Sequence, residues 1–285
     1  MKQKGSAKTM YIITAILIVL FFIWQNNHIV RSDHNYISEK IPAEFNGFKI
    51  VHISDLHNKS FGTDQGYILD KISSASPDII IVTGDLIDRR RFDLETSLLF
   101  IKGAMEIAPI YYVSGNHEAL SGEYENITSQ LINHGVIVLD DAKVELVKDN
   151  SKIEILGLND PAFITSRYSD ITDTSEMKEN LNIMRDDSIF QILLSHRPEL
   201  IDIYSEKNID MIFSGHAHGG QFRIPGIGGI VAPGQGFFPK YESGSHILNN
   251  STIYVSRGLG NSLIPIRIFN RPEIVVVTLL RHQTR

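Results

Sequence analysis

Residues 78–89 read Asp-Ile-Ile-Ile-Val-Thr-Gly-Asp-Leu-Ile-Asp-Arg, an apolar, β-branched run that ends in a glycine and an acid. The four apolar residues Ile79 to Val82 predict a strand buried on both faces, as in a sheet that is covered by other layers. Gly84 lets the backbone turn sharply, so that Asp85 emerges at the carboxyl end of this strand. The stretch predicts an α/β fold with polar side chains at strand ends.

Strand and helix candidates continue on both sides of this stretch. Strands are expected at 48–54, 78–83, 110–114, 143–147, 153–158, 189–194, 210–213, 252–256 and 273–280. Helices are expected at 64–75, 94–107, 124–133, 175–185 and 197–206. The strand–helix alternation of the first half favours βαβ units and a largely parallel sheet. The simplest architecture is two sheets packed face to face with helices outside.

Composition narrows the class of protein. The chain has 285 residues, of which 42% are hydrophobic and 21% charged, which is ordinary for a globular protein. It has no cysteine, which excludes disulfides, thiolate zinc sites and cysteine nucleophiles. Residues 1–31 hold four of the 27 basic residues and no acid, which leaves 23 basic residues against 33 acids. Because this remainder is acidic, we expect no nucleic-acid partner.

Residues 10–24 form an uncharged apolar run that follows three lysines and ends at Trp24. Its length falls between a signal-peptide core and a full membrane span. No small-x-small cleavage site follows it, so we expect an uncleaved transmembrane signal anchor; a cleaved signal peptide and a buried helix are the alternatives. The lysines predict that the basic tail, residues 1–9, is cytoplasmic and that the body is extracytoplasmic on a single-pass cell-membrane protein.

Residues 25–44 are polar with little periodicity and are expected to be a linker. The folded domain is then expected to cover residues 45–285.

Five short islands contain residue types that bind divalent metals. They are Asp55-Leu56-His57, Gly84-Asp85-Leu86-Ile87-Asp88-Arg89, Gly115-Asn116-His117-Glu118, Ser195-His196-Arg197 and Gly215-His216-Ala217-His218-Gly219-Gly220-Gln221. Taken alone, Asp85 would suit a helix N-cap, and Asp55 with His57 would suit a solvated turn. Because four of the five islands follow apolar runs, the joint pattern favours two adjacent divalent metals at strand ends.

The order D-x-H, G-D-x-x-D-R, G-N-H-E, H and G-H-x-H resembles the calcineurin-like metallophosphoesterase superfamily over about residues 45–280. The signal anchor and the tracts 218–221, 232–236 and 256–260 resemble its bacterial membrane- or wall-associated phosphodiesterase branch, which includes UDP-diacylglucosamine hydrolases. The resemblance implies a four-layered α/β/β/α sandwich of two mixed sheets flanked by helices.

The resemblance also implies a role for each residue. Asp55, His57 and His218 would hold one metal ion, Asn116, His196 and His216 the other, and Asp85 would bridge them. His117 would act at the leaving group, oriented by Asp88. Oxygen and nitrogen donors without sulfur suit Mn²⁺, Fe, Zn²⁺ or Mg²⁺. Apart from the resemblance, Arg89 and Arg257 are candidates to contact a substrate phosphate, and pairing with acids is an equal alternative for both.

The expected function is metal-dependent hydrolysis of a phosphodiester or pyrophosphate by a dinuclear centre with a bridging hydroxide. A lipid-linked or envelope substrate fits the anchor, and membrane attachment would occur through that anchor. A phosphoprotein phosphatase is the alternative enzyme, although no long insert suggests peptide docking. A non-catalytic scaffold is the other alternative, and it should lack a ligand or His117, yet none is missing. The oligomeric state is left open by the sequence.

Overall fold

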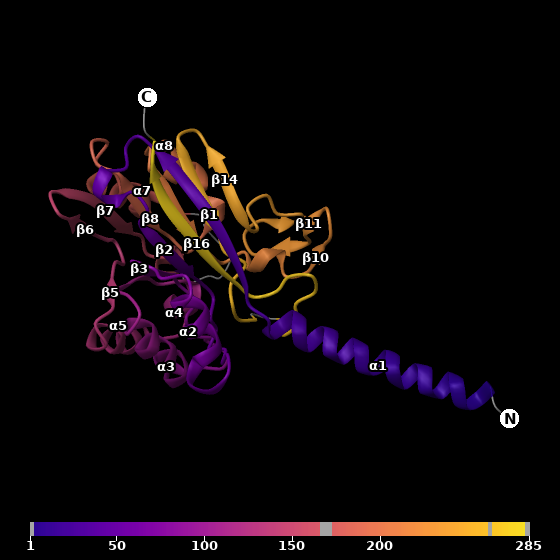
Figure 1. The fold of residues 1–285 in the computed structure, drawn as a ribbon. Helices are drawn as coiled ribbons and strands as arrows, with labels where there is room; N and C mark the ends of the chain where they lie inside the picture. The colour runs from indigo at the N-terminus through magenta and orange to yellow at the C-terminus, as the bar shows by residue number, and fades with distance from the viewer. Residues whose placement is uncertain (1–2, 166–172, 262–263, 283–285) are drawn as a thin grey trace.

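The computed structural model describes residues 3–165, 173–261 and 264–282. Two six-stranded sheets face each other, helices cover both outer faces, and a long N-terminal helix projects from the body (Figure 1). The expected four-layered α/β/β/α sandwich is confirmed.

The first sheet has the strand order β1-β16-β2-β3-β4-β5. Its strands are β1 (Val30–Ser38), β16 (Glu273–Arg281), β2 (Lys49–Ile53), β3 (Ile79–Thr83), β4 (Ile110–Val113) and β5 (Ile137–Val138). Strands β2 to β5 are parallel, β16 is antiparallel to β2, and β1 is parallel to β16. The carboxyl ends of β2, β3 and β4 therefore meet at one edge.

The second sheet has the order β14-β15-β9-β8-β7-β6. Its strands are β14 (Gly244–Leu248), β15 (Ser251–Val255), β9 (Met211–Ser214), β8 (Gln191–Leu194), β7 (Ser151–Gly157) and β6 (Ala142–Lys148). The four central strands are parallel, and an antiparallel strand closes each edge. Both sheets are therefore mixed, as expected.

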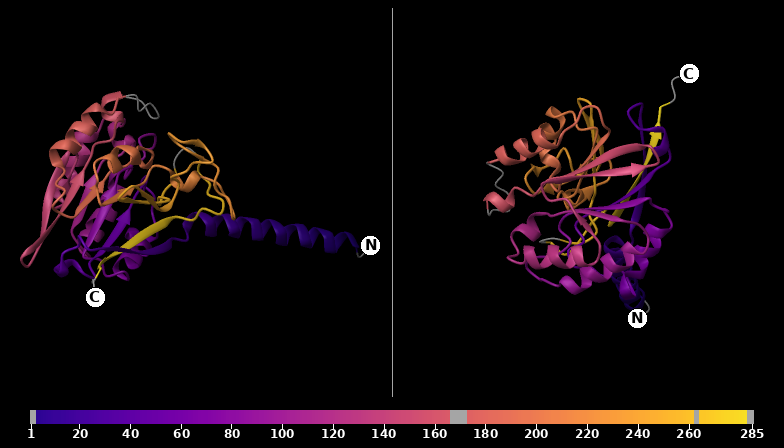
Figure 2. Two further views of the ribbon diagram at one scale, coloured as in Figure 1. Left: turned by 90° about the horizontal axis from the view of Figure 1, so that it is seen from above. Right: turned by 90° about the vertical axis from the view of Figure 1, so that its left-hand side faces the viewer.

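The helices form the outer layers (Figure 2). Those on the first sheet are α2 (Gly66–Ser73), α3 (Leu94–Met105) and α5 (Tyr124–Asn133), and those on the second are α7 (Ser175–Met184) and α8 (Ile201–Glu206). Shorter helical elements are α4 (Asn116–Ala119), α6 (Ala162–Thr165), η1 (Ala43–Phe45), η2 (Thr63–Gln65), η3 (Pro198–Leu200) and η4 (His218–Gly220). The segment after η4 contains the two-residue strands β10 (Arg223–Ile224), β11 (Gly228–Gly229), β12 (Val231–Ala232) and β13 (Gly236–Phe237).

Strand β3 shows why a strand that is covered on both faces has an unbroken apolar run. Ile79 and Ile81 pack into the core between the two sheets, whereas Ile80 and Val82 pack against the helices. Because each face of the sheet is covered, successive side chains are all buried. The layers thus hold the strand ends, and the loops that follow them, in fixed positions.

The expected linker at residues 25–44 is wrong. Helix α1 (Gln3–Asn27) extends into it, and β1 pairs with β16 along all nine of its residues. The sequence signal was weak because β1 is an edge strand whose alternate side chains are only half-buried and include Ser32 and His34. The folded body therefore begins at Val30 rather than at residue 45.

Helix α1 is longer than the expected segment of residues 10–24. Within its stretch Ala7–Asn27, an 18-residue segment has a mean hydropathy of 2.1 and none of that segment is buried in the rest of the protein. By length and composition it is able to cross a membrane, since about 20 residues suffice.

Truncations should separate the helix from the body. Removing residues 1–19 should leave the melting temperature nearly unchanged, because residues 8–19 of the helix are exposed and the contacts of Phe21 and Trp24 with the body stay in place. Removing residues 1–39 also deletes β1 and uncovers the edge of β16. We expect a loss of about 3 kcal/mol, or roughly 10 °C in Tm, together with aggregation. Thermal unfolding by circular dichroism and gel filtration measure both effects, and equal melting temperatures would contradict a structural role for β1.

Candidate metal centre

The candidate site lies where loops leave the carboxyl ends of strands from both sheets. Asp55 and His57 follow β2, Asp85 and Asp88 follow β3, Asn116 and His117 follow β4, His196 follows β8, and His216 and His218 follow β9. All nine side chains are buried. The five islands of the sequence therefore converge on one place.

The backbone at this place is strained. Five of the candidate residues have positive φ angles: Asp55 (52°), His57 (48°), Asp85 (52°), His216 (61°) and His218 (49°). Such angles are unfavourable for residues with a side chain and persist where the surrounding structure imposes them, often at functional sites. Neighbouring glycines allow close approach, since a Cβ atom at Gly115 would collide with the Asp85 carboxylate and one at Gly215 with that of Asp55.

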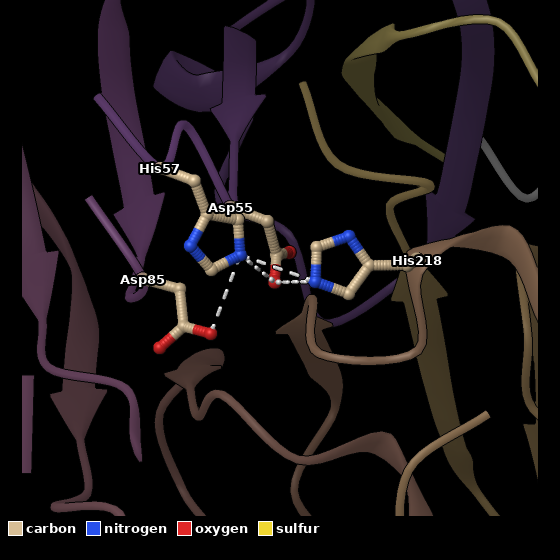
Figure 3. Close-up of side chains that lie close together, drawn as sticks. All are labelled: Asp55, His57, Asp85 and His218. Carbon is tan, nitrogen blue, oxygen red and sulfur yellow. Dashed lines mark hydrogen bonds and ion pairs between the residues drawn. The ribbon is translucent and has the colours of Figure 1, made fainter. Parts of the chain in front are cut away.

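A first cluster consists of Asp55, His57, Asp85 and His218 (Figure 3). The Nε2 atom of His218 lies 3.3 Å from Oδ1 of Asp55, and Nε2 of His57 lies 3.6 Å from Oδ2 of Asp85. The two Nε2 atoms lie 3.2 Å apart. Four ligand atoms thus lie within 4.8 Å of one another, close enough to share one cation.

A second cluster consists of Asp85, His196 and His216. The Nε2 atom of His196 lies 3.3 Å from Oδ2 of Asp85 and 3.2 Å from Nδ1 of His216. Asp85 belongs to both clusters. Its carboxylate is therefore the group that the two clusters share.

Main-chain carbonyls select the tautomers of two histidines. The Nδ1–H group of His196 donates to the carbonyl of Thr83 at 2.7 Å, and that of His57 faces the carbonyl of Ile87 at 3.3 Å. Each Nε2 atom then faces the cluster. Such outer contacts orient metal-binding histidines in known sites.

The donor set fits divalent cations. Asn116 is fully buried, yet neither its amide oxygen nor its amide nitrogen has a hydrogen-bond partner, and Oδ2 of Asp85 accepts no hydrogen bond. Buried polar atoms are rarely left this way unless a missing partner completes them. A cation bound by carboxylate, amide oxygen and imidazole would satisfy the two oxygen atoms, although not the amide nitrogen of Asn116.

The charges of the buried side chains also indicate a site for a cation. Burial raises the pKa of Asp55. Burial would also raise the pKa of Asp85, but the nearby imidazoles, that of His196 first, hold it well below its usual range. Burial alone would lower the pKa of His196, yet the Asp85 carboxylate outweighs it and raises that pKa to about 10. The site thus holds positive charge beside Asp85, and a metal ion would replace the proton there.

His117 lies beside the clusters without joining them. Its ring centroid is 4.4 Å from that of His57, and its main-chain N–H donates to Asp85 at 2.8 Å. Its Nδ1 atom accepts the main-chain N–H of Arg89 at 3.1 Å, while Oδ1 of Asp88 lies 3.5 Å away. Because Nδ1 accepts, Nε2 carries the proton, and burial lowers the pKa of this imidazole to about 3.

Asp88 is therefore near His117 but is not its closest partner. Its carboxylate accepts two hydrogen bonds from Arg91, at 3.0 and 2.8 Å, and one from the main chain of Arg90 at 3.0 Å. Asp88 thereby fixes the turn that aims the Arg89 amide at His117.

The two candidate phosphate ligands differ. Arg257 is paired with Glu273 at 2.9 Å, so the structure shows the ion pair that the sequence had left as an alternative. Arg89 is half-buried beside His117, and its Nε atom is buried without a hydrogen-bond partner. Arg89 is the better placed of the two to contact a substrate.

Sequence reasoning gave no role to Glu118. Its buried carboxylate accepts three main-chain N–H groups: Asp85 at 2.8 Å, Ile87 at 3.1 Å and Gly115 at 2.8 Å. It thereby joins the loops after β3 and β4. Its position three residues after Gly115, as in a capping box, was the available signal.

A second missed group lies behind His216. Arg197 forms two hydrogen bonds with Asp160, at 2.8 and 2.9 Å, and its Nη1 lies 3.6 Å from Glu199. Oε1 of Glu199 lies 3.8 Å from Nε2 of His216. This buried group of charges therefore lies next to His216.

Known proteins share this sequence pattern. Residues 48–220 match the family model described as calcineurin-like phosphoesterase. The "uncharacterized metallophosphoesterase YkuE" of Bacillus subtilis (strain 168) is 31% identical, over 88% of this chain and 85% of its own length. "Phosphodiesterase YaeI" of Escherichia coli (strain K12) is 28% identical over 82% of each chain. A Danio rerio "transmembrane protein with metallophosphoesterase domain" is 25% identical over 94% of this chain and 61% of its own length.

Glu118→Gln should weaken the site without touching a ligand. The amide replaces one acceptor oxygen by a donor that faces main-chain N–H groups. We expect a loss of about 3 kcal/mol in unfolding free energy and roughly 10- to 100-fold weaker Mn²⁺ binding. Chemical denaturation and calorimetric titration measure these two quantities. The exposed Glu125→Gln is the matched control, and equal behaviour of the two variants would show that Glu118 does not support the loops.

Proposed function

Because the chain belongs to the calcineurin-like phosphoesterase family, we propose that it hydrolyses a phosphodiester or pyrophosphate with two divalent metal ions. It is a hydrolase that acts on phosphoester bonds. The observation that carries the proposal is the sharing of Asp85 by two clusters of buried carboxylates and imidazoles. That arrangement suits a pair of ions rather than one.

Each ion has its own ligands. Asp55, His57 and His218 would hold one, Asn116, His196 and His216 would hold the other, and Asp85 would contact both. When bound, the ions would activate water as the nucleophile and neutralise charge on the phosphoryl oxygens. The oxygen and nitrogen donors are compatible with Mn²⁺, Fe, Zn²⁺ or Mg²⁺.

His117 would assist the leaving group. The Arg89 amide occupies its Nδ1 atom, so the neutral ring has an Nε2–H to donate. That hydrogen bond would stabilise negative charge on the departing oxygen in the transition state. Asp88 would keep the supporting turn in place, and the Arg89 side chain would contact the phosphoryl group.

A cavity of about 360 Å³ adjoins the first cluster at His57. The residues that line it are His57, Asn58, Lys59, Arg91, Asp93, Asn261 and Pro265. Arg91 and Lys59 line it together with the acid Asp93, and burial lowers the pKa of Lys59 to about 7, so its polar groups are of both signs. Its position supports a substrate that is larger than inorganic pyrophosphate.

The N-terminal helix supports a membrane location. We infer that Ala7–Asn27 spans the cell membrane once, with the basic tail in the cytoplasm and the catalytic body outside. A body held at the membrane favours a lipid-linked or envelope phosphoester as the substrate.

Asp85→Asn should abolish turnover. The amide loses the charge that both ions require, so we expect a decrease on the order of 10³-fold in kcat for bis(p-nitrophenyl) phosphate with Mn²⁺. The exposed Asp70→Asn serves as the control and should keep wild-type activity. Turnover of the Asp85 variant at the control's rate would rule out a shared metal ligand.

His117→Gln should leave metal binding unchanged and slow the hydrolysis step. Bound metal, measured by elemental analysis, should stay unchanged because His117 is in neither cluster. We expect kcat to fall by roughly 10²- to 10⁴-fold for an alkyl leaving group and much less for p-nitrophenolate, which leaves without help. An equal loss with both leaving groups would assign His117 a different role.

A further inference from the structure

Helix α1 is packed against the body at its C-terminal end. The rings of Phe21 and Phe269 meet edge to face at 5.6 Å, and the guanidinium of Arg271 lies 4.5 Å from the ring of Trp24. The side chain of Asn26 accepts the main-chain N–H of Arg267 at 2.9 Å. The helix is therefore packed against the loop that precedes β16 and is not joined to the body by a flexible linker alone (Figure 1).

These contacts fix the height of the loop relative to a membrane. Phe21 lies inside the span Ala7–Asn27, six residues before its end. At 1.5 Å per residue that is about 9 Å along the helix axis, and the span needs most of its length to cross about 30 Å of hydrocarbon. Phe269, which contacts Phe21, therefore belongs in the outer part of the hydrocarbon layer, below the membrane boundary.

The same region exposes apolar side chains. Ile264, Ile266 and Phe269 are 38, 41 and 51% exposed, and Ile224 and Ile227 in the adjoining β10–β11 hairpin are 39 and 67% exposed. The hairpin is joined to the loop by the N–H of Arg223, which donates to the carbonyl of Ile268 at 3.0 Å. Ile224, Ile227 and Phe269 line one shallow cavity. We call these five side chains the apolar surface.

The charges around the apolar surface suit a lipid headgroup region. Glu242, the acid that lines the shallow cavity, is paired with Arg223. Arg271 lies over Trp24, an aromatic and cationic pair of the kind found at membrane interfaces. Exposed apolar side chains with charged and aromatic neighbours of this kind are typical of proteins that bind to the surface of a bilayer.

We propose that the apolar surface rests in the lipid bilayer that α1 spans, so that the catalytic body lies on the membrane instead of standing away from it. This rests on the proposed membrane anchoring of α1. The occupant is lipid because the apolar surface is continuous with the part of α1 that lies in the span.

The loop that precedes β16, which carries Ile264, Ile266 and Phe269, also contacts the turn that carries His218. The Asn270 amide donates to the carbonyls of His218 and Gln221, at 2.7 and 3.0 Å, and the Gln221 amide donates to those of Ile264 and Ile266, at 2.9 and 3.0 Å.

Pro265 and Asn261 of the same loop also line the cavity beside His57. The cavity thus opens beside the bilayer. The substrate class that fits is an amphiphilic phosphoester whose headgroup enters the cavity while its chains stay in lipid.

The test uses the full chain in liposomes, and the absence of cysteine permits single-site labelling. Ile227→Cys and Phe269→Cys are labelled with an environment-sensitive fluorophore, and spin-labelled phospholipids act as quenchers. Val147→Cys and Ile183→Cys, which replace exposed apolar residues at 63 and 73% exposure, are the controls. We expect at least about twofold stronger lipid quenching at 227 and 269 than at the controls, as for groups buried in the headgroup boundary.

Two results would overturn the docking proposal. The first is equal quenching at all four positions. The second is a label at 227 or 269 that is shielded from aqueous iodide but not quenched by lipid, which would indicate contact with a second copy of the chain. Because quenching does not depend on turnover, failure of the proposed activity would leave this result intact, and the two failures can be told apart.

The substrate class is tested with two esters that share one leaving group, methyl and hexadecyl p-nitrophenyl phosphate. Ile227→Ser should lower kcat/KM about 10-fold for the hexadecyl ester in vesicles and leave that for the methyl ester unchanged, because only the first depends on lipid contact. Ile183→Ser is the control. An equal effect on both esters would contradict delivery of the substrate from the bilayer.

Discussion

The buried carboxylate of Asp85 is the constraint on which the rest of this structure depends. A negative charge that is shielded from water raises the free energy of the folded state unless positive charge lies next to it. Here imidazoles approach the Asp85 carboxylate from loops of both sheets. Both sheets must therefore end their central strands at the same place. Metal ions would complete this balance, so that folding and metal binding are expected to be coupled.

The strained loops survive because other groups hold them. Glu118 binds three main-chain N–H groups across two loops, and the Thr83 carbonyl orients His196. These contacts are short and buried, and none involves a residue that would contact the substrate. They hold the loops from which the candidate ligands project, and such fixed positions favour electrostatic catalysis.

The anchor and the catalytic body form one unit. Strand β1 follows α1 after two residues and pairs with β16, and the loop before β16 contacts α1 again through Phe269. That loop also holds the turn that carries His218. Through this short series of contacts, the orientation of the helix in a membrane would determine which way the reaction site faces.

The sequence by itself predicted two packed sheets with helices outside, because unbroken apolar runs mark covered strands and four of the five polar islands follow such runs. The roles of the nine candidate residues came from the resemblance to the family. The sequence could not determine that β1 is a strand, since an edge strand with polar inward residues has no clear period. It also could not assign Glu118, which joins residues about 30 positions apart, or the contact of Phe21 with Phe269. Only the tertiary structure decided these, because hydrogen bonds and packing between distant segments depend on where the sheets bring the chain together.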